Sequence, residues 1–175
     1  MRRRELLAGA AGLGVLGGGA ALAYDAVSLT GQGGIDAIEL EGIEAPGSTA
    51  GTIVVPERGR TSVVEVFATW CTVCEASMRP LGRVHAGVDE DVQFVSVTNE
   101  PLGNTTTRED VAEWWAANDG NWQVAYDADL DLTRALEATG VPYAFVLDED
   151  NEVTWSHRGR VEAGPLESAI ESARP

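Results

Sequence analysis

Cys71 and Cys74 are the residues of this 175-residue chain whose type and spacing most directly suggest chemistry. They are its only cysteines, and they follow a short apolar run where a buried strand should end and a helix begin. The free N–H groups and the dipole at a helix start lower the pKa of a thiol, and the thiolate is the reactive form. We therefore expect Cys71 to be the attacking, partly exposed sulfur. Cys74 should be the shielded sulfur that resolves a mixed disulfide.

Other uses of the cysteine pair stay open. A structural disulfide here would close a very short loop, and the stabilisation grows with loop length. A structural zinc ion needs further ligands, but His85 and His157, the only histidines, are expected far along the following helix and on a late strand. Two thiols could also bind Cu(I) in a copper carrier. We favour thiol–disulfide exchange over these uses. We expect no metal and no other cofactor.

The segments around the cysteines show alternating strand and helix patterns. Residues 35–56 indicate a β-hairpin, residues 61–68 a strand buried on both faces, and residues 75–86 a helix. Further strands are expected at residues 92–97, 122–125, 144–147 and 153–157, and further helices at 107–117, 129–138 and 165–173. Alternation implies parallel pairing, and the last two strands form an antiparallel hairpin. The chain should therefore have an α/β fold, a mixed sheet with helices on both faces.

Two stretches carry a family resemblance: VVEVFATWCTVC, which ends at Cys74, and TGVPYAFVLDEDNEV, which begins at Thr139. With them the chain resembles the thioredoxin superfamily over residues 35–173, and it is most similar to the exported TlpA/ResA-like thiol–disulfide oxidoreductases. The resemblance implies a thioredoxin-like three-layer fold with an N-terminal β-hairpin extension. It also implies a cis bond between Val141 and Pro142, with Pro142 facing Cys71 and the Val141 backbone aimed at a bound peptide that pairs as an extra strand.

Two further residues near the cysteines have expected roles, and that of Glu65 is implied by the resemblance. Glu65, six positions before Cys71, matches a buried acid beneath the second sulfur of classical thioredoxins. Burial should raise the pKa of Glu65, so that it accepts the proton of Cys74 as that thiol attacks. Trp70, beside Cys71, should shield the thiol and contact the partner protein.

The sequence departs from the family pattern at two places. The residue before the second cysteine is usually proline and is here Val73, and the acid three positions after that cysteine is here Ser77. Thr72 and Val73, between the cysteines, should tune the redox potential. The resemblance favours a reductant over an oxidant. It implies protein disulfide or dithiol substrates and a membrane or exported electron donor, and the alternative is a copper-binding assembly chaperone with the two thiols as Cu(I) ligands.

The charge balance excludes one class of partner. Asp and Glu number 28, Lys and Arg together 12, and the net charge is −16, with every basic residue an arginine. Nucleic acid is excluded because its phosphates need a basic surface.

An acidic, lysine-free chain fits a halophilic archaeon, since strong salt screens the self-repulsion. Negative charge from a GC-rich coding bias is the alternative. We expect a monomer.

The chain begins with an export pattern. Residues 1–23 have three arginines after Met1, then a glycine-rich apolar stretch that ends in small residues, which is typical of a twin-arginine-type signal. The segment is either cleaved or kept as a membrane anchor. Residues 24–34 read as a linker and residues 35–175 as the thioredoxin-like domain. Both readings predict an exported, extracytoplasmic protein, secreted or anchored to the outer face of the cell membrane, where disulfides persist.

Overall fold

A seven-stranded mixed sheet forms the centre of the domain in the computed structural model, which describes residues 34–103 and 105–175. The strand order is β2-β1-β5-β4-β3-β6-β7. Strands β3, β4 and β5 pair in parallel, and the other neighbours pair antiparallel. The signal or anchor expected at residues 1–23, and the linker except its last residue, lie outside the described residues.

The elements follow the expected order. The strands are β1 (Ile38–Gly42), β2 (Gly51–Val55), β3 (Ser62–Phe67), β4 (Gln93–Thr98), β5 (Gln123–Tyr126), β6 (Tyr143–Leu147) and β7 (Val153–Arg158). The helices are α1 (Thr72–His85), α2 (Arg108–Ala117), α3 (Asp131–Ala135) and α4 (Ala163–Ala173). The α/β fold and the N-terminal β-hairpin are thereby confirmed.

Two helices differ most from their expected bounds. Helix α3 is much shorter than the expected 129–138, because Leu130 and Glu137 on either side of it have left-handed backbones, with φ of 61° and 52°. Helix α1 begins at Thr72 rather than at Glu75, because Cys71 caps it. The second difference matters for function, since it places both cysteines at the very start of the helix.

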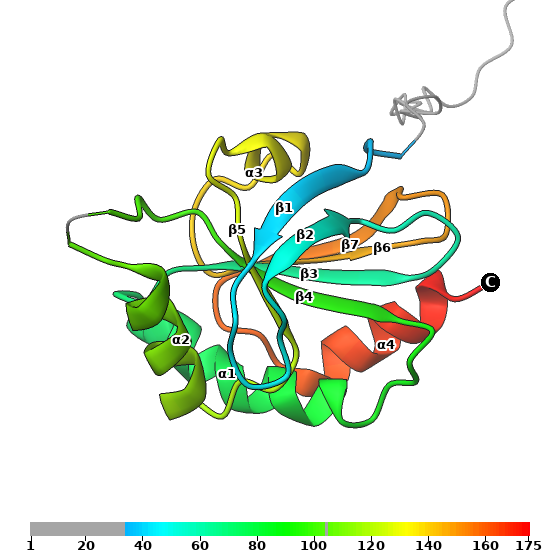
Figure 1. Cartoon of the computed structure of the whole chain (residues 1–175). Coiled ribbons are helices and arrows are strands. Elements are labelled where there is room, and N and C mark those ends of the chain that lie inside the picture. The colour runs from blue at the N-terminus through cyan, green and yellow to red at the C-terminus, as the bar shows by residue number, and fades with distance from the viewer. Residues whose placement is uncertain (1–33, 104) are drawn as a thin grey trace, which may run out of the picture. The chain divides into compact units, whose positions relative to one another are not determined.

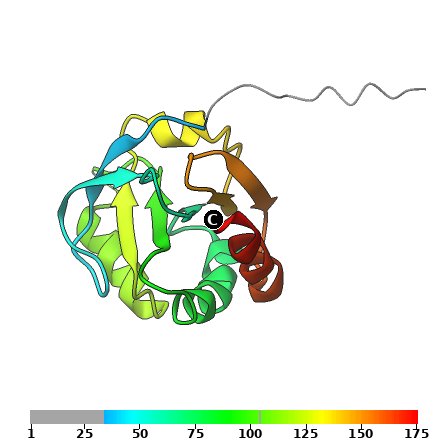
Figure 2. The same cartoon turned by 90° about the vertical axis from the view of Figure 1, so that its right-hand side faces the viewer.

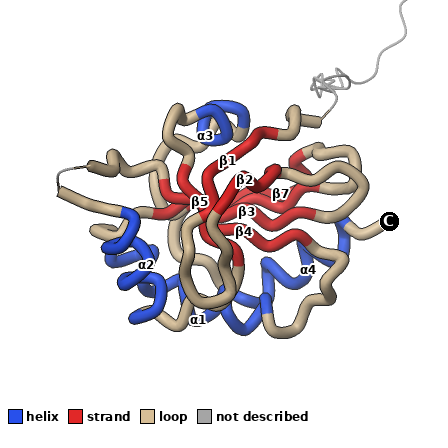
Figure 3. Tube along the Cα trace, viewed as in Figure 1, coloured by secondary structure: helices blue, strands red, loops and turns tan. Residues whose placement is uncertain are grey.

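The helices divide unequally between the faces of the sheet (Figures 1 and 3). Helices α1, α2 and α4 cover one face, and α3 lies on the other. The view along the sheet in Figure 2 shows the same layers. One buried cluster holds the cysteines with Val63, Phe67 and residues of α1, α2 and α4, and the other holds Val64 and Val66 with Leu132 of α3. No helix of the described residues is both long and apolar enough to cross a membrane.

Strand β3 positions the site. All six of its residues are buried, as the apolar run predicts for a central strand. Side chains alternate along a strand, so Glu65 shares a face with Val63 and Phe67, which belong to the cluster under α1. The strand therefore delivers a carboxyl group into the core layer that contains both cysteines.

Candidate active site

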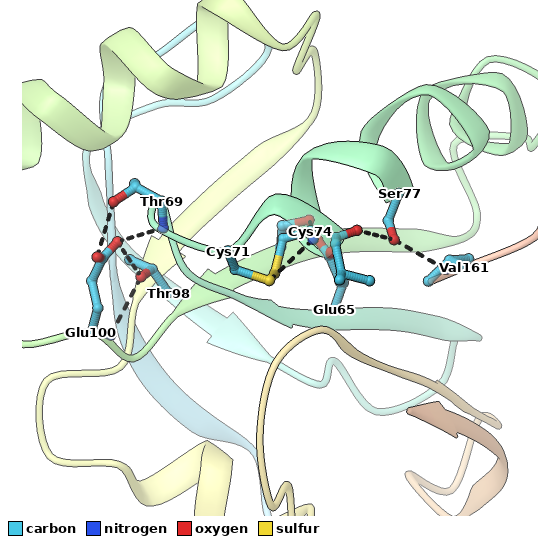
Figure 4. The surroundings of a disulfide bond; sticks show 10 residues. Glu65, Thr69, Cys71, Cys74, Ser77, Thr98, Glu100 and Val161 are labelled. Atoms are coloured by element: carbon cyan, nitrogen blue, oxygen red, sulfur yellow. Dashed lines mark hydrogen bonds between the residues drawn. A yellow bond between two sulfur atoms is a disulfide. The ribbon is translucent and has the colours of Figure 1, made fainter. Parts of the chain in front are cut away.

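Cys71 and Cys74 are joined by a disulfide at the start of α1, with their Cα atoms 5.2 Å apart (Figure 4). Cys71 is the N-cap residue, and the Cys74 amide donates to its Sγ at 3.1 Å. Cys71 retains 7% of its surface exposure and Cys74 none. Cys71 is thus the more exposed of the two cysteines, as expected, but it is buried in the oxidised structure rather than partly exposed.

The helix start gives Cys71 a favourable environment for negative charge. The amides in the first turn of a helix have no carbonyl partner within the helix, and one of them already points at Cys71 Sγ. In the reduced protein the same amide can donate to a thiolate, which stabilises that form. The local geometry therefore favours Cys71 as the nucleophile.

Glu65 lies fully buried in the layer beneath α1. Its Oε2 accepts a 2.7 Å hydrogen bond from the Ser96 hydroxyl, which itself accepts one of 3.0 Å from Trp122 Nε1. Glu65 and Ser96 are direct partners in the pairing of β3 with β4, so the register brings them together. Glu65 Oε1 has no hydrogen-bond partner among the described residues.

Burial raises the pKa of Glu65 from 4.5 to about 7, and the Ser96 hydrogen bond opposes this only in part. A carboxyl group with this pKa exchanges protons readily near neutral pH. The buried acid expected from the sequence is therefore present. Ser96, which donates to this acid, and Trp122, which donates to Ser96, were not anticipated.

Two apolar side chains flank the disulfide at the surface. Trp70 is 71% exposed and Val73 is 45% exposed. Thr72, the first residue of α1, is exposed as well. Exposed large apolar groups beside a reactive sulfur can contact a partner protein.

The bond between Val141 and Pro142 is cis, as the resemblance implies. Val141 packs against the cluster that holds the two cysteines. Within the described chain, neither its amide nor its carbonyl makes a backbone hydrogen bond. These groups therefore remain free to pair with an added strand.

Ser77, at the position where the resemblance implies an acid, links two elements. Its side chain is buried, donates to the Val73 carbonyl at 3.0 Å and accepts from the Val161 amide at 3.0 Å (Figure 4). It connects α1 to the segment before α4. Ser77 brings no charge to the site, so the buried acid beneath α1 is Glu65.

Both histidines pack against aromatic side chains away from the cysteine pair. His85 packs against Phe94 and Trp122, and His157 stacks on Trp155. Among the described residues, no group of three or more His, Cys, Asp or Glu is arranged to hold a metal ion.

The Redoxin family's sequence profile matches residues 52–173, which include both cysteines, Glu65 and Pro142. The chain belongs to the Redoxin family. This Redoxin chain is 28% identical over 127 residues to the thiol:disulfide interchange protein DsbE of Yersinia pestis. The match covers 71% of the chain and 62% of that relative, so the chain spans less than two thirds of the relative's length.

Solved structures share the fold of this Redoxin protein. The exposed lipoprotein thioredoxin of Streptococcus pneumoniae aligns with a TM-score of 0.66 at 18% identity, over 78% of this chain and 99% of that one. A thiol:disulfide interchange protein of the thioredoxin family from Chlorobium tepidum aligns with a TM-score of 0.66 at 16% identity, over 82% of this chain and 97% of that one. At these identities the likeness establishes the thioredoxin-like fold.

Proposed function

We propose that this chain is an exported thiol–disulfide oxidoreductase that works through the Cys71–Cys74 couple, more as a reductant than as an oxidant. The observation that carries the proposal is the cysteine pair at the start of α1, in the same core layer as buried Glu65. The names of the DsbE relative and of the Chlorobium protein support the same chemistry.

The first step is attack by the Cys71 thiolate on one sulfur of a substrate disulfide. A bond forms between Cys71 Sγ and that sulfur, and the other substrate sulfur leaves as a thiolate. The Cys74 amide, now 3.1 Å from Cys71 Sγ, supports the negative charge before attack. Trp70 and Val73 contact the partner protein, and the Val141 backbone pairs with its chain.

The second step releases the substrate. Cys74 passes its proton to the Glu65 carboxylate and attacks Cys71 Sγ, which re-forms the disulfide and expels the second substrate thiolate. Two electrons have then passed from the cysteine pair to the substrate disulfide, whose two sulfurs become thiols. A membrane or exported dithiol donor returns the pair to the reduced state. A carboxyl with a pKa of about 7 suits the proton transfer, because it is partly ionised at neutral pH.

The location and habitat form part of the proposal. The arginine-led apolar segment at residues 1–23 supports export by a twin-arginine-type signal, either cleaved or kept as an anchor. The Streptococcus relative is named as an exposed lipoprotein. The net charge of −16 supports a halophilic source, in which strong salt screens repulsion between carboxylates.

A reduction assay in several molar salt tests the proposal. The wild-type chain, supplied with dithiothreitol, should accelerate the reduction of insulin disulfides, and Cys71→Ser should abolish that acceleration. Full activity in Cys71→Ser would refute the mechanism. Tight Cu(I) binding by the reduced chain together with no acceleration by the wild type would instead support the copper-chaperone alternative.

A further inference from the structure

A second buried acid, Glu100, lies beside the disulfide and has no part in the steps above. It follows β4 and is only 4% exposed. Its carboxylate accepts three hydrogen bonds: from the Thr69 amide at 3.0 Å, the Thr69 hydroxyl at 3.0 Å and the Thr98 hydroxyl at 3.2 Å. Figure 4 shows this group on the Cys71 side of the disulfide, opposite Ser77 and Val161.

Hydrogen-bond donors surround the Glu100 carboxylate. Its hydrogen-bond partners all donate, which suits a group that only accepts. None of the ion pairs among the described residues involves Glu100. A buried negative charge without a cation is costly, and hydroxyl and amide donors offset that cost only in part.

The carboxylate is tied to the segment that presents the nucleophile. Thr69 stands two positions before Cys71, and its amide and hydroxyl both bond to Glu100. Two residues span at most about 7 Å, so the carboxylate lies within about 10 Å of the Cys71 backbone. Trp70 lies between Thr69 and Cys71 in the chain. The hydrogen bonds from Thr69 to Glu100 therefore also hold the segment that presents Trp70 to the partner protein.

We propose that Glu100 is a positioning residue for Cys71: it holds the Thr69–Cys71 segment in place, and its buried charge disfavours the Cys71 thiolate. A less stable thiolate makes the reduced pair a stronger reductant, because reduction potential rises as the reduced form is stabilised. Glu100 therefore opposes the effect of the helix start and biases the couple toward electron donation. This inference rests on the proposed role of Cys71 as the attacking thiol.

Other charged groups lie on the elements around Cys71. Glu65 lies in the layer below on β3, and Glu75 stands exposed in the first turn of α1. From β7, the Arg158 guanidinium packs over Gly140, next to Val141. Glu75 and Arg158 are exposed and are screened by salt, whereas Glu100 is buried and is screened much less.

The test compares the titration of Cys71 in matched variants of the reduced full chain. Iodoacetamide alkylation is followed against pH, and fragment mass spectrometry identifies the modified cysteine. Glu100→Gln keeps the shape and removes the charge. It should raise the thiolate-to-thiol ratio of Cys71 at a fixed pH by roughly 15-fold, the effect of a unit charge about 10 Å away at an effective dielectric constant of about 20. The gain should persist in several molar salt.

Two further variants sharpen the outcome. Glu75→Gln removes an exposed charge from α1, and its effect should vanish in several molar salt. Thr69→Val keeps the Glu100 charge and removes one of its donors. The carboxylate is then less compensated, so the Cys71 thiolate fraction should fall, opposite to the change in Glu100→Gln.

The results separate three conclusions. If Cys74 is alkylated first in the wild type, the assignment of the nucleophile fails, and this inference fails with it. If Cys71 reacts first but Glu100→Gln leaves its titration unchanged, or loses its effect in strong salt, only the inference about Glu100 is overturned. Should Glu100→Gln not fold, Thr69→Val decides: a thiolate fraction that is unchanged or larger overturns the inference.

Discussion

Ser96 donates a 2.7 Å hydrogen bond to Glu65, its direct partner across the parallel pair β3 and β4. The bond fixes one carboxyl oxygen, while the other oxygen, Oε1, has no partner among the described residues. A carboxyl group held in this way has one oxygen available for a transferred proton. The pairing of the two strands therefore prepares Glu65 for the role proposed in the second step of exchange.

The proton transfer predicts a pH dependence of the resolving step. Glu65 must be ionised to accept the Cys74 proton, so the rate of substrate release should rise with pH through about 7, the pKa of Glu65. Glu65→Gln should remove this rise and slow release roughly 10²-fold, within the usual range for a general base. Rapid-mixing kinetics of mixed-disulfide decay across pH would measure both effects. An unchanged inflection near pH 7 in Glu65→Gln would exclude Glu65 as the base.

The same burial predicts a change of stability with pH. The folded chain holds the Glu65 proton up to about pH 7, while the unfolded chain releases it near 4.5. Between these values the folded state binds more protons, so the free energy of unfolding falls as pH rises, by about 3 kcal/mol in total. Denaturant unfolding of the wild type and of Glu65→Gln at several pH values would show this. The difference in the free energy of unfolding between the wild type and Glu65→Gln should change between pH 4.5 and about 7 and stay constant outside that range.

The direction of electron flow predicts a reduction potential. As a reductant, the Cys71–Cys74 couple should lie near roughly −270 mV, rather than near the roughly −120 mV of a strong oxidant. Thr72 and Val73, both exposed at the start of α1, should shift this value when exchanged. Equilibration of the chain with glutathione or dithiothreitol buffers in several molar salt would give the potential. A reduction potential near roughly −120 mV would indicate an oxidant and contradict the proposed direction of electron flow.

The exposed ring of Trp70 predicts a selective loss of affinity. Trp70→Ala should raise KM for a protein disulfide, because the partner loses a large apolar contact, and should leave the reduction of a small-molecule disulfide nearly unchanged. Val153→Ala, an exposed apolar residue on β7, is the matched control and should change neither. Equal losses on both substrates would indicate that Trp70 acts on the cysteines rather than on the partner.

The sequence predicted those parts of the site that depend on local pattern. The unbroken apolar flanks of Glu65 indicated a buried strand, and the cysteines after it indicated a helix start. The partners of the buried acids depend on tertiary contacts instead. Ser96 meets Glu65 only because of the register between two strands, 31 positions apart in the chain. Nothing in the local sequence distinguishes Glu100 from a solvated loop acid.

The helix bounds also divide into those that the local sequence predicts and those that it does not. Thr107 and Asp110 form a capping box at the start of α2, a signal that the local sequence contains. The left-handed backbones of Leu130 and Glu137 that shorten α3 have no such signal, because neither residue favours that conformation. The family resemblance, rather than the pattern of residues, supplied the cis bond before Pro142.

The central claim is that Cys71 attacks and Cys74 resolves, and one trapping measurement tests it most directly. Reduced Cys74→Ser is mixed with a peptide disulfide in several molar salt, and the product is analysed by intact and fragment mass spectrometry. The account predicts a stable adduct on Cys71 that carries half of the peptide disulfide, while Cys71→Ser forms none at a comparable rate. If Cys71→Ser forms the adduct as fast on Cys74, or if Cys74→Ser forms none while the wild type reduces the peptide, the account is contradicted.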